Sequence, residues 1–268
     1  MMADTRAPLV DAHFHTWRRD HPLTDEAWHA PPTEAPVEDI VEILDRHGVI
    51  FGVVAAASIF GEYNDYVRQV VRKHKRLRAT AVLSPRTDIH KLEQMKADGF
   101  VGARLMWVFS EKVPEIDGGD YRLFLRRLAD LDWHVHLVDK PERLENAIKA
   151  VERSGTRLVI DHMGDLQVPD GVNNPAFKAI LAAIDRGNTW VKVSCRFRFK
   201  PPHAADAFAE QLLRVGGGDR ILWGSDWPFA AFEHEMTYEK ALADYYRLVP
   251  DAERRRRIDE TALRFYFT

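Results

Sequence analysis

Short apolar runs rich in β-branched residues alternate with longer segments of helical periodicity along this 268-residue chain. The strand candidates fall near residues 8–13, 49–57, 77–83, 100–107, 133–139, 157–162, 189–195 and 220–225. Helix candidates fall between them at 36–47, 64–75, 88–98, 120–132, 141–154, 174–186, 202–215 and 233–248, and a last helix begins near Asp251. This alternation predicts a parallel sheet, because each helix supplies the crossover that joins two parallel strands.

The number of strand-helix units points to one architecture. Eight units in a chain of this length favour a closed (β/α)8 barrel, the TIM barrel, which takes about 250 residues. An open doubly wound sheet is the alternative, but no Gly-x-Gly-x-x-Gly follows an early strand, and the glycines at 216–218 stand at a predicted helix end. No linker rich in proline, glycine or serine divides the chain, so we expect one α/β domain over residues 1–268.

Charge and hydropathy argue against several classes of partner. The net charge of −3 gives no reason to expect nucleic acid or an anionic membrane, and acidic residues flank the one basic run, at 254–257. No apolar run approaches the roughly 20 residues that span a bilayer, and the first residues lack the apolar core of a signal peptide. We therefore expect a cytoplasmic protein. The sequence leaves open whether it forms a homo-oligomer.

Histidines and an aspartate follow several of the predicted strands. In a barrel of this type, the carboxyl ends of the strands surround one active site. His13 and His15 end the first candidate, and residues two apart in an extended strand project from the same face. His162 and Asp226 end the sixth and eighth candidates. We expect the four side chains to meet at the open end of the barrel, its mouth. The alternatives are that His162 is a hydrogen-bonded core histidine and that Asp226 is a turn residue that bonds to nearby backbone.

These residue types support two kinds of chemistry. Three imidazoles and a carboxylate can hold a single zinc-like divalent ion with a position left for water. His136 is a further candidate ligand, although His134 and His136 could equally well line the barrel. Without metal, Asp226 would act as general base toward water while the imidazoles polarise a carbonyl group. The residues alone do not choose between the two.

Three arginines indicate an anionic substrate. Arg104 lies in an apolar run, where burying an unpaired charge is costly, so it must meet either a structural carboxylate or a substrate carboxylate. Arg196 and Arg198, two residues apart, would share one side if the seventh strand continues. The remaining candidates for substrate binding are Ser194 and the aromatic residues Trp107 and Trp227. Plain core packing is the alternative for both tryptophans.

Four segments together resemble one known family. They are 10–15 (VDAHFH), 159–164 (VIDHMG), 191–194 (VKVS) and 223–228 (WGSDWP). In this order and spacing they are similar to the amidohydrolase-related family, in the branch of 2-pyrone-4,6-dicarboxylate lactonase and related lactone hydrolases. The resemblance implies a (β/α)8 barrel that hydrolyses a lactone. The catalytic residues that it implies are His13, His15, His162 and Asp226, and the residues that hold a substrate carboxylate are Arg104 and Arg198.

The resemblance also bears on the cofactor. It implies no metal for the dicarboxylate lactonase branch and zinc for the sulfomuconolactone hydrolase and decarboxylase branches. Arg104 and Trp107 stand at the fourth strand end, where a binuclear amidohydrolase would need a lysine, so we expect no binuclear site. Ser110 stands where the dicarboxylate lactonase has a further arginine, which argues against complete recognition of a dicarboxylate.

The combined expectation is a hydrolase of a small anionic lactone from aromatic or sugar-lactone catabolism. Asp226 would activate water, and the cofactor would be either none or one divalent ion. A zinc-dependent decarboxylase of the same superfamily, in which His136 or His162 moves a proton, is the alternative. A barrel that only binds a ligand is a third hypothesis, and the histidines and the aspartate argue against it.

Overall fold

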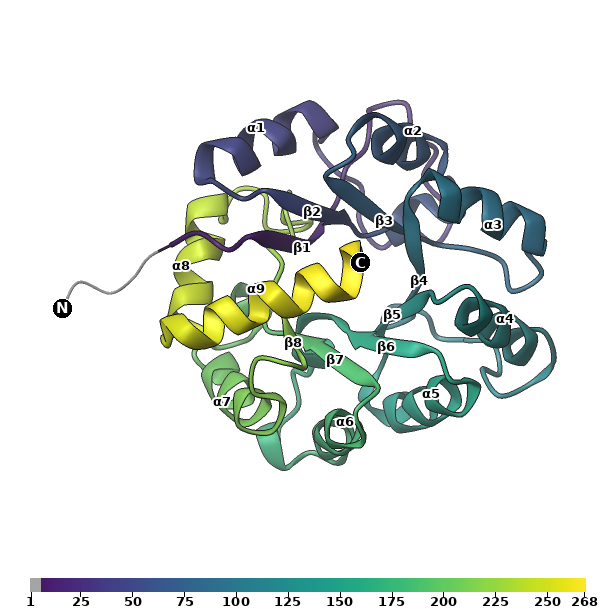
Figure 1. Ribbon diagram of the computed structural model, residues 1–268. Helices are drawn as coiled ribbons and strands as arrows, with labels where there is room; N and C mark the ends of the chain where they lie inside the picture. The colour runs from purple at the N-terminus through teal and green to yellow at the C-terminus, as the bar shows by residue number, and fades with distance from the viewer. Residues whose placement is uncertain (1–5) are drawn as a thin grey trace.

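Eight parallel strands pair in sequence order within residues 6–268, the part of the chain that the computed structural model describes. The strands are β1 (Val10–Phe14), β2 (Phe51–Val54), β3 (Leu77–Ala81), β4 (Phe100–Met106), β5 (His134–Val138), β6 (Arg157–Ile160), β7 (Thr189–Lys192) and β8 (Ile221–Leu222). Ala12 N donates to the Trp223 carbonyl at 2.9 Å, and Asp226 N donates to the His13 carbonyl at 2.8 Å. These bonds join the two ends of the sheet, and the predicted barrel is confirmed (Figure 1).

Helices surround the strands. They are α1 (Val37–His47), α2 (Asp65–Lys73), α3 (Ile89–Asp98), α4 (Gly119–Asp130), α5 (Pro141–Ser154), α6 (Pro175–Arg186), α7 (Ala204–Gly216), α8 (Tyr238–Leu248) and α9 (Ala252–Phe267). Single 3-10 turns occur at η1 (Ser58–Phe60), η2 (Asp161–Asp165), η3 (Gly171–Asn173) and η4 (Arg196–Arg198). The predicted helices are confirmed, but α8 begins later than residue 233. The Thr237 side chain accepts a hydrogen bond from Lys240 N and so caps the helix there.

Capping residues explain where other helices begin and end. The side chains of Asp88 and Asn174 accept hydrogen bonds from the first turns of α3 and α6, as N-cap residues do. Gly48 and Gly99 end α1 and α3 in the left-handed conformation, with φ of 72° and 119°. Glycine adopts this conformation without a steric penalty. None of the helices in residues 6–268 is long and apolar enough to cross a membrane.

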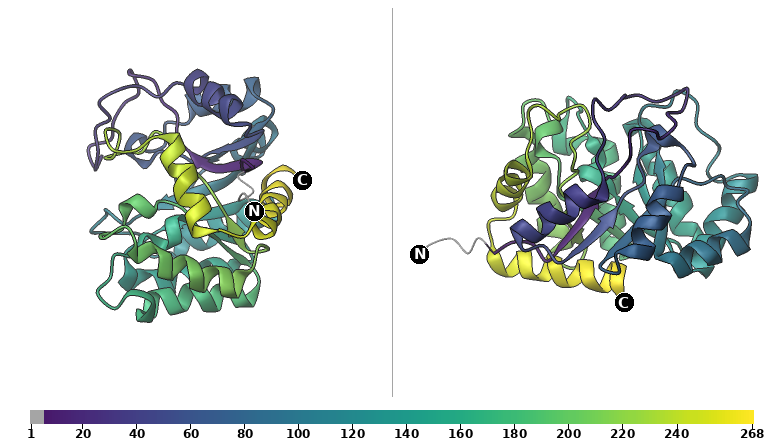
Figure 2. Two further views of the ribbon diagram at one scale, coloured as in Figure 1. Left: turned by 90° about the vertical axis from the view of Figure 1, so that its left-hand side faces the viewer. Right: turned by 90° about the horizontal axis from the view of Figure 1, so that it is seen from above.

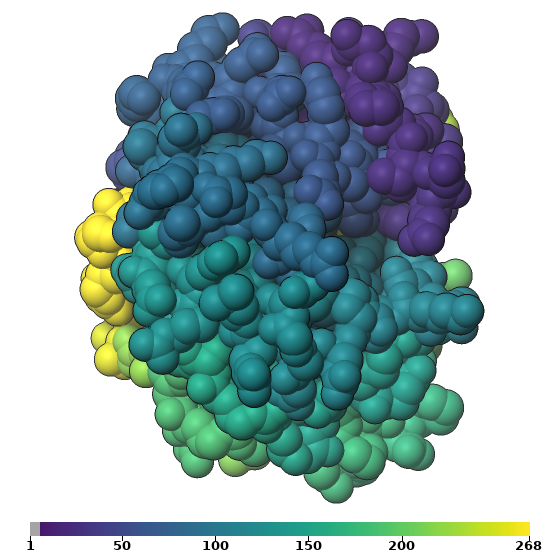
Figure 3. All heavy atoms as spheres, turned by 90° about the vertical axis from the view of Figure 1, so that its right-hand side faces the viewer, coloured from purple at the N-terminus to yellow at the C-terminus, as the bar shows by residue number. Residues whose placement is uncertain are grey.

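The last helix, α9, closes the amino-terminal end of the barrel. One buried apolar cluster joins α9 to the inside of the strands; its members are Val10, Ala12, Val53, Val159, Leu222, Ala262, Phe265 and Tyr266. Figure 2 shows α9 lying across one end of the molecule, with the loops that follow the strands at the opposite end. In Figure 3, the purple segment after β1 likewise stands on the side away from the yellow α9. The open end is therefore the carboxyl end of the strands, where barrels of this type bind ligands.

An irregularity in β1 changes which side chains face the interior. Ala12 packs in the interior cluster, yet Phe14, only two residues later, packs in the cluster between sheet and helices. The pairing register with β2 shifts between Asp11 and Phe14, as it does at a β-bulge, where one strand contains an extra residue. The bulge reverses the alternation, so that His13 and His15 both turn into the barrel mouth.

Candidate active site

Three imidazoles and a carboxylate meet at the carboxyl end of the barrel. Asp226 Oδ1 lies 3.2 Å from His15 Nε2, 3.5 Å from His162 Nε2 and 3.6 Å from His13 Nε2. The Nε2 atoms of the two β1 histidines are 3.3 Å apart. All four side chains are buried. The residues that we expected at one mouth therefore surround a single carboxylate oxygen.

Neighbouring groups orient two of these rings. His15 Nδ1 lies 2.8 Å from the Ala55 carbonyl oxygen. Since a carbonyl only accepts, Nδ1 carries a proton and donates it to Ala55, and Nε2 faces the mouth. His162 Nδ1 lies 3.0 Å from both Ser194 Oγ and Cys195 Sγ. Burial lowers the pKa of His162 to about 4, against the opposing effect of Asp226, so this ring is neutral near pH 7.

Arg198 holds the second oxygen of Asp226. It donates to Oδ2 from Nη2 at 2.7 Å and from Nε at 3.2 Å, and Nη2 also donates to the Ala230 carbonyl at 3.2 Å. Burial by itself raises the pKa of Asp226, but Arg198, together with His162 and His15, holds this pKa well below its usual range. The carboxylate is therefore ionised, with Oδ1 left to the imidazoles.

Left-handed backbone conformations present these groups to the mouth. Asp226 has a φ of 67°, and residues 162–165 have φ between 50° and 83°. For non-glycine residues this conformation costs roughly 1–2 kcal/mol each, and such strain concentrates at functional sites. Gly224 allows the chain after β8 to lie directly against His13, because a Cβ at position 224 would overlap His13 backbone atoms. Both features depend on tertiary contacts.

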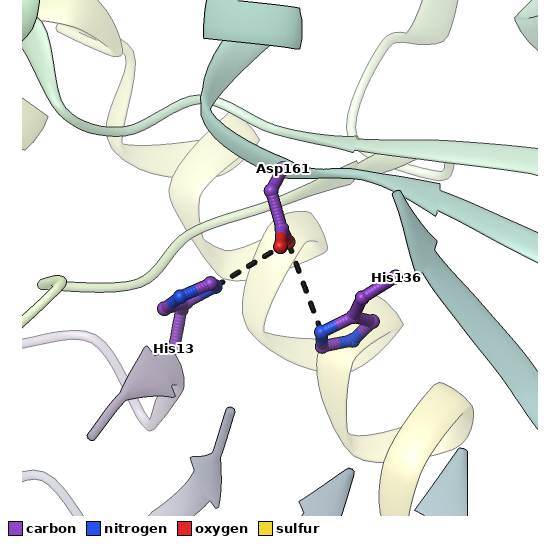
Figure 4. A group of neighbouring side chains, drawn as sticks. All are labelled: His13, His136 and Asp161. Carbon is purple, nitrogen blue, oxygen red and sulfur yellow. Dashed lines mark ion pairs between the residues drawn. The ribbon is translucent and has the colours of Figure 1, made fainter. Parts of the chain in front are cut away.

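A second charged layer, centred on Asp161, lies beneath the mouth. Asp161 Oδ1 is 2.9 Å from Lys192 Nζ and 3.3 Å from His13 Nδ1. It is also 3.8 Å from His136 Nδ1 (Figure 4). Arg104 Nε donates to Asp161 Oδ2 at 3.1 Å. His13 therefore connects the two layers, with Nδ1 in the lower layer and Nε2 at the mouth.

Burial and mutual attraction oppose each other in the lower layer. Burial raises the pKa of Asp161, but Lys192, His13 and His136 together hold it well below its usual range. Burial lowers the pKa of Lys192 to about 8, although Asp161 opposes this shift. The pKa of His136 lies well below its usual value because of burial and Lys192. Near pH 7 the layer thus contains an ammonium, a carboxylate and neutral rings.

Lys192 and Asp161 were not predicted as site residues from the sequence, and both are fully buried. A signal was available for the lysine. Lys192 stands between Val191 and Val193 in a strand, and a charge in such a run must meet an opposite charge, as we argued for Arg104. The anion that Arg104 meets is the structural carboxylate of Asp161.

A pocket opens above the mouth, with a polar floor and an apolar outer wall. The polar lining residues are His15, Ser58, Arg104, His162, Asp165, Arg198 and Asp226, and the larger apolar ones are Trp17, Trp28, Ile59, Met106, Val108 and Phe109. Trp28 and Phe109 come from the segments after β1 and β4, and their rings stack with centroids 4.4 Å apart. The pocket is suited to a small ligand that has both an apolar face and charged groups.

Arg196 does not join the pocket. Its Nε lies 2.8 Å from Asp206 in α7, and its Nη1 lies 3.4 Å from Asp244 in α8. The expectation that it shares one side with Arg198 assumed a continued strand, but β7 ends at Lys192 and the two arginines fall in the turn η4. In such a turn, residues two apart do not face the same way.

Four other predicted residues lie beside the pocket or beneath it. Ser194 lies behind His162, at its Nδ1. Trp107 packs edge-on against Tyr121, and Trp227 packs against the cluster around Trp17; neither is among the residues that line the pocket. His136 lies in the lower layer, below the mouth, where Nε2 is 3.2 Å from the Tyr266 hydroxyl of α9.

Comparisons with known proteins agree with this architecture. A family model described as Amidohydrolase matches residues 10–268. The chain is 26% identical over 261 residues to a 4-sulfomuconolactone hydrolase of Hydrogenophaga intermedia, covering 92% of this chain and 84% of that protein. It is 28% identical over 269 residues to a 2-pyrone-4,6-dicarboxylate hydrolase of Comamonas testosteroni, covering 92% and 86%. A similar fold is found in the crystal structure of a probable 2-pyrone-4,6-dicarboxylic acid hydrolase from Acinetobacter baumannii with citric acid bound. Its TM-score is 0.92 and its sequence identity is 27%, and the match covers 97% of this chain and 100% of that chain.

Proposed function

This chain belongs to the amidohydrolase family, and we propose that it hydrolyses the ring ester of a small anionic lactone. The observation that carries the proposal is the meeting of three imidazole Nε2 atoms at Asp226 Oδ1, on the floor of a pocket bordered by Arg104 and Arg198. The relatives named as hydrolases of 4-sulfomuconolactone and 2-pyrone-4,6-dicarboxylate support lactones as the substrate class. Both of these compounds are anionic cyclic esters.

The two arginines would recognise the anionic group. Within residues 6–268, the other guanidinium nitrogens of Arg104 and Arg198 are engaged, but Arg104 Nη2 and Arg198 Nη1 donate no hydrogen bond to the protein. A guanidinium presents five N–H donors, so these two nitrogens are available to a substrate carboxylate. The aromatic wall would pack against the lactone ring. Binding in this way would place the ring carbonyl above Asp226.

Asp226 is the residue that we assign to proton transfer. Water would attack the lactone carbonyl carbon and give a proton to Oδ1. While Arg198 holds Oδ2, the carboxylate is a weak base, since its pKa is held low. Sharing of Arg198 with a substrate carboxylate would weaken that ion pair and raise the basicity of Asp226. Binding of an anionic substrate would therefore prepare the base for the reaction.

The imidazoles would stabilise the carbonyl oxygen, which becomes an oxyanion in the same step. Lys192 Nζ lies 2.9 Å from His13 Nδ1. When the ammonium donates to Nδ1, the ring proton is on Nε2 and faces the mouth. There it can donate to the oxyanion. Collapse of the oxyanion breaks the ring C–O bond, and the leaving oxygen takes up the proton that Asp226 received.

The mouth also fits a single divalent ion. The ligands of a tetrahedral zinc ion, each at about 2.0–2.1 Å, lie about 3.4 Å from one another. The separations among His13 Nε2, His15 Nε2 and Asp226 Oδ1, 3.2–3.6 Å, agree with this value. We propose that His13, His15 and Asp226 are its ligands, with His162, whose Nε2 lies 3.5 Å from the same carboxylate oxygen, as the fourth. With the ion bound, the His13 ring proton would lie on Nδ1, facing Asp161 Oδ1, and not on Nε2. Such an ion, when bound, would polarise the lactone carbonyl and lower the pKa of water.

The lower layer does not fit a second ion in the same way. Its possible ligands, His13, His136 and Asp161, are close enough to hold a metal. The Lys192 ammonium, however, lies 2.9 Å from both Asp161 Oδ1 and His13 Nδ1 and so supplies the positive charge there. This supports a single ion rather than a binuclear site.

The test of the proposed function uses three lactones and the Asp226→Asn variant. The lactones are muconolactone, 2-pyrone-4,6-dicarboxylate and glucaric acid monolactone, and the assay follows the ring-opened acid. We expect hydrolysis of at least one by the natural protein and a loss of kcat of about 100-fold or more in the variant, as for the removal of a general base. Asp170→Asn, at an exposed position, is the control. Unchanged kcat in Asp226→Asn would remove this residue from the reaction, and release of carbon dioxide would favour the decarboxylase.

Removal of metal provides a separate test. We expect dialysis against a chelator to lower both the hydrolysis rate and the thermal unfolding midpoint, and zinc to restore both, because an ion that binds only the folded chain stabilises it. Elemental analysis of the purified protein gives the stoichiometry, expected at one ion per chain. Full activity in a preparation without metal would exclude the ion and leave the mechanism that uses the side chains alone.

A further inference from the structure

Two buried polar atoms belong to residues of the pocket wall and have no hydrogen-bond partner within residues 6–268. They are Asp165 Oδ1 and Trp28 Nε1. A carboxylate oxygen accepts hydrogen bonds, and an indole nitrogen donates one. Buried polar atoms without a partner are uncommon, because the loss of hydration is not compensated. A ligand that fills the pocket can supply the partners that the protein does not.

The backbone presents Asp165 on the same side as His162. Residues 162–165 form a left-handed turn directly after β6, with φ of 52°, 57°, 83° and 50°. Both His162, at the start of this turn, and Asp165, at its end, line the pocket. Gly164 holds the turn close to α6, where a Cβ would lie 2.9 Å from Ile180 Cδ1. Asp165 is therefore placed next to the reacting groups.

The charges near Asp165 decide what kind of group it can accept. Arg198 is the cation that acts on it, but Arg198 is already bonded to Asp226. Burial raises the pKa of Asp165, Asp226 adds to this effect and Arg198 opposes it. A second carboxylate on the substrate would be repelled here. A hydroxyl group is neutral and can donate to Oδ1.

We propose that Asp165 is a specificity-determining residue that accepts a hydrogen bond from a hydroxyl substituent of the lactone and excludes a second carboxylate. Trp28 Nε1 donates to another oxygen of the same substrate. The inference rests on the proposed function and defines its substrate class: a lactone with one carboxylate, held by Arg104 and Arg198, and at least one hydroxyl. No bond forms or breaks at Asp165.

The experiment compares three lactone probes that carry different numbers of carboxylates and hydroxyls. Glucaric acid monolactone has one carboxylate and several hydroxyls, muconolactone has one carboxylate and no hydroxyl, and 2-pyrone-4,6-dicarboxylate has two carboxylates and no hydroxyl. For Asp165→Ala, we expect kcat/KM to fall about tenfold to 100-fold on the first probe, as for a lost substrate hydrogen bond. On muconolactone we expect a change of no more than about twofold.

Two further variants separate charge from shape. Asp165→Asn removes the negative charge and keeps the size, so kcat/KM for the dicarboxylate should rise. Trp28→Phe removes the Nε1 donor but retains a ring to stack on Phe109, so the hydroxylated probe should lose more activity than the other two. Asp170→Ala, on the same loop but exposed, should change none of the three rates. Circular dichroism of each variant verifies that the barrel is folded.

The outcomes distinguish this inference from the proposed function. Equal losses on the hydroxylated and unhydroxylated monocarboxylates in Asp165→Ala would overturn the inference while lactone hydrolysis stands. If the natural protein hydrolyses none of the probes, the proposed function fails. Binding is then measured by quenching of tryptophan fluorescence, since Trp17 and Trp28 line the pocket. Tighter binding of the hydroxylated probe that is lost in Asp165→Ala would support the inference, and equal or absent binding would overturn it.

Discussion

Lys192 and Asp161 depend on each other within the barrel interior. Their ion pair is 2.9 Å long, and both side chains are inaccessible to solvent. Removal of one partner from a buried pair leaves the other charge without compensation and costs about 3–5 kcal/mol. We expect Lys192→Met to lower the free energy of unfolding by about 3 kcal/mol, at the lower end of this range because Asp161 keeps Arg104. Urea denaturation measures this value.

A double variant separates loss of the pair from loss of packing. Lys192→Met combined with Asp161→Leu should destabilise the protein by less than the sum of the two single changes, because neither charge is then left alone. Lys149→Met is the matched control, since Lys149 forms an exposed pair with Glu145, and its effect should stay below about 0.5 kcal/mol. Strict additivity of the two buried changes would contradict a coupled pair.

The need of a charged residue for a partner could be predicted from the sequence wherever that residue stands in an apolar run, because burying an unpaired charge is costly. For this reason Arg104 was expected to meet an anion, and Lys192 needs one equally. Asp161 could not be identified as the common partner in this way, since the pairing joins β4, β7 and the turn η2 that follows β6. The separation of Arg196 from Arg198 was also beyond the sequence, because it depends on where β7 ends and η4 begins.

Among the secondary-structure elements, α9 contributes to stability from the end of the barrel opposite the mouth. Phe265 of α9 is 6% exposed and belongs to the cluster that fills this end. Truncation of a buried phenylalanine costs about 3–5 kcal/mol. We therefore expect Phe265→Ala to lower the free energy of unfolding by about this amount while kcat/KM of the remaining folded protein is unchanged.

The neighbouring Phe267 provides the comparison for that experiment. It is only partly buried and packs on Phe51 near the end of the helix. Phe267→Ala should therefore cost clearly less than Phe265→Ala. If Phe265→Ala lowered kcat/KM as strongly as stability, α9 would be coupled to the mouth, for which Tyr266 and His136 offer a route.

Hydrophobic periodicity was sufficient to predict the strands, the helices and their order. It could not predict the bulge in β1 or the left-handed turn after β6. Both depend on contacts with distant segments: His13 lies against Gly224, and Gly164 lies against Ile180. The predicted convergence of His13, His15, His162 and Asp226 was correct because the barrel architecture brings all strand ends to one place.

For the whole molecule, the buried histidines predict a stability that rises with pH in the mildly acidic range. Four of the buried imidazoles, those of His13, His134, His136 and His162, carry the effect. Burial lowers the pKa of each below the usual 6.5, that of His162 to about 4. Below about pH 6.5 the unfolded chain takes up protons that the folded chain does not, so the folded state is stabilised as the pH rises toward 6.5.

Carboxyls act in the opposite direction where burial raises their pKa, and Asp165 and Asp244 are among them. Burial raises the pKa of Asp11 and of Asp259 to about 6, so the folded chain gains up to two protons as the pH falls below 6. The four imidazoles outweigh these carboxyls, because the unfolded imidazoles take up protons over this whole range. We expect the unfolding midpoint to rise by about 5 °C or more between pH 5 and pH 6.5, as measured by scanning calorimetry at constant ionic strength. A flat or falling midpoint over this range would contradict the assignment of neutral buried rings.

The closure of the barrel through β1 has a consequence for synthesis. The second edge of β1 pairs only with the segment after β8, and Leu9 N donates to Asp259 in α9 at 2.8 Å. A chain leaving the ribosome therefore carries a first strand with one edge unpaired until more than 200 residues have followed it. Contacts this distant in sequence slow folding. During translation, that exposed edge is the part of the chain most in need of a chaperone.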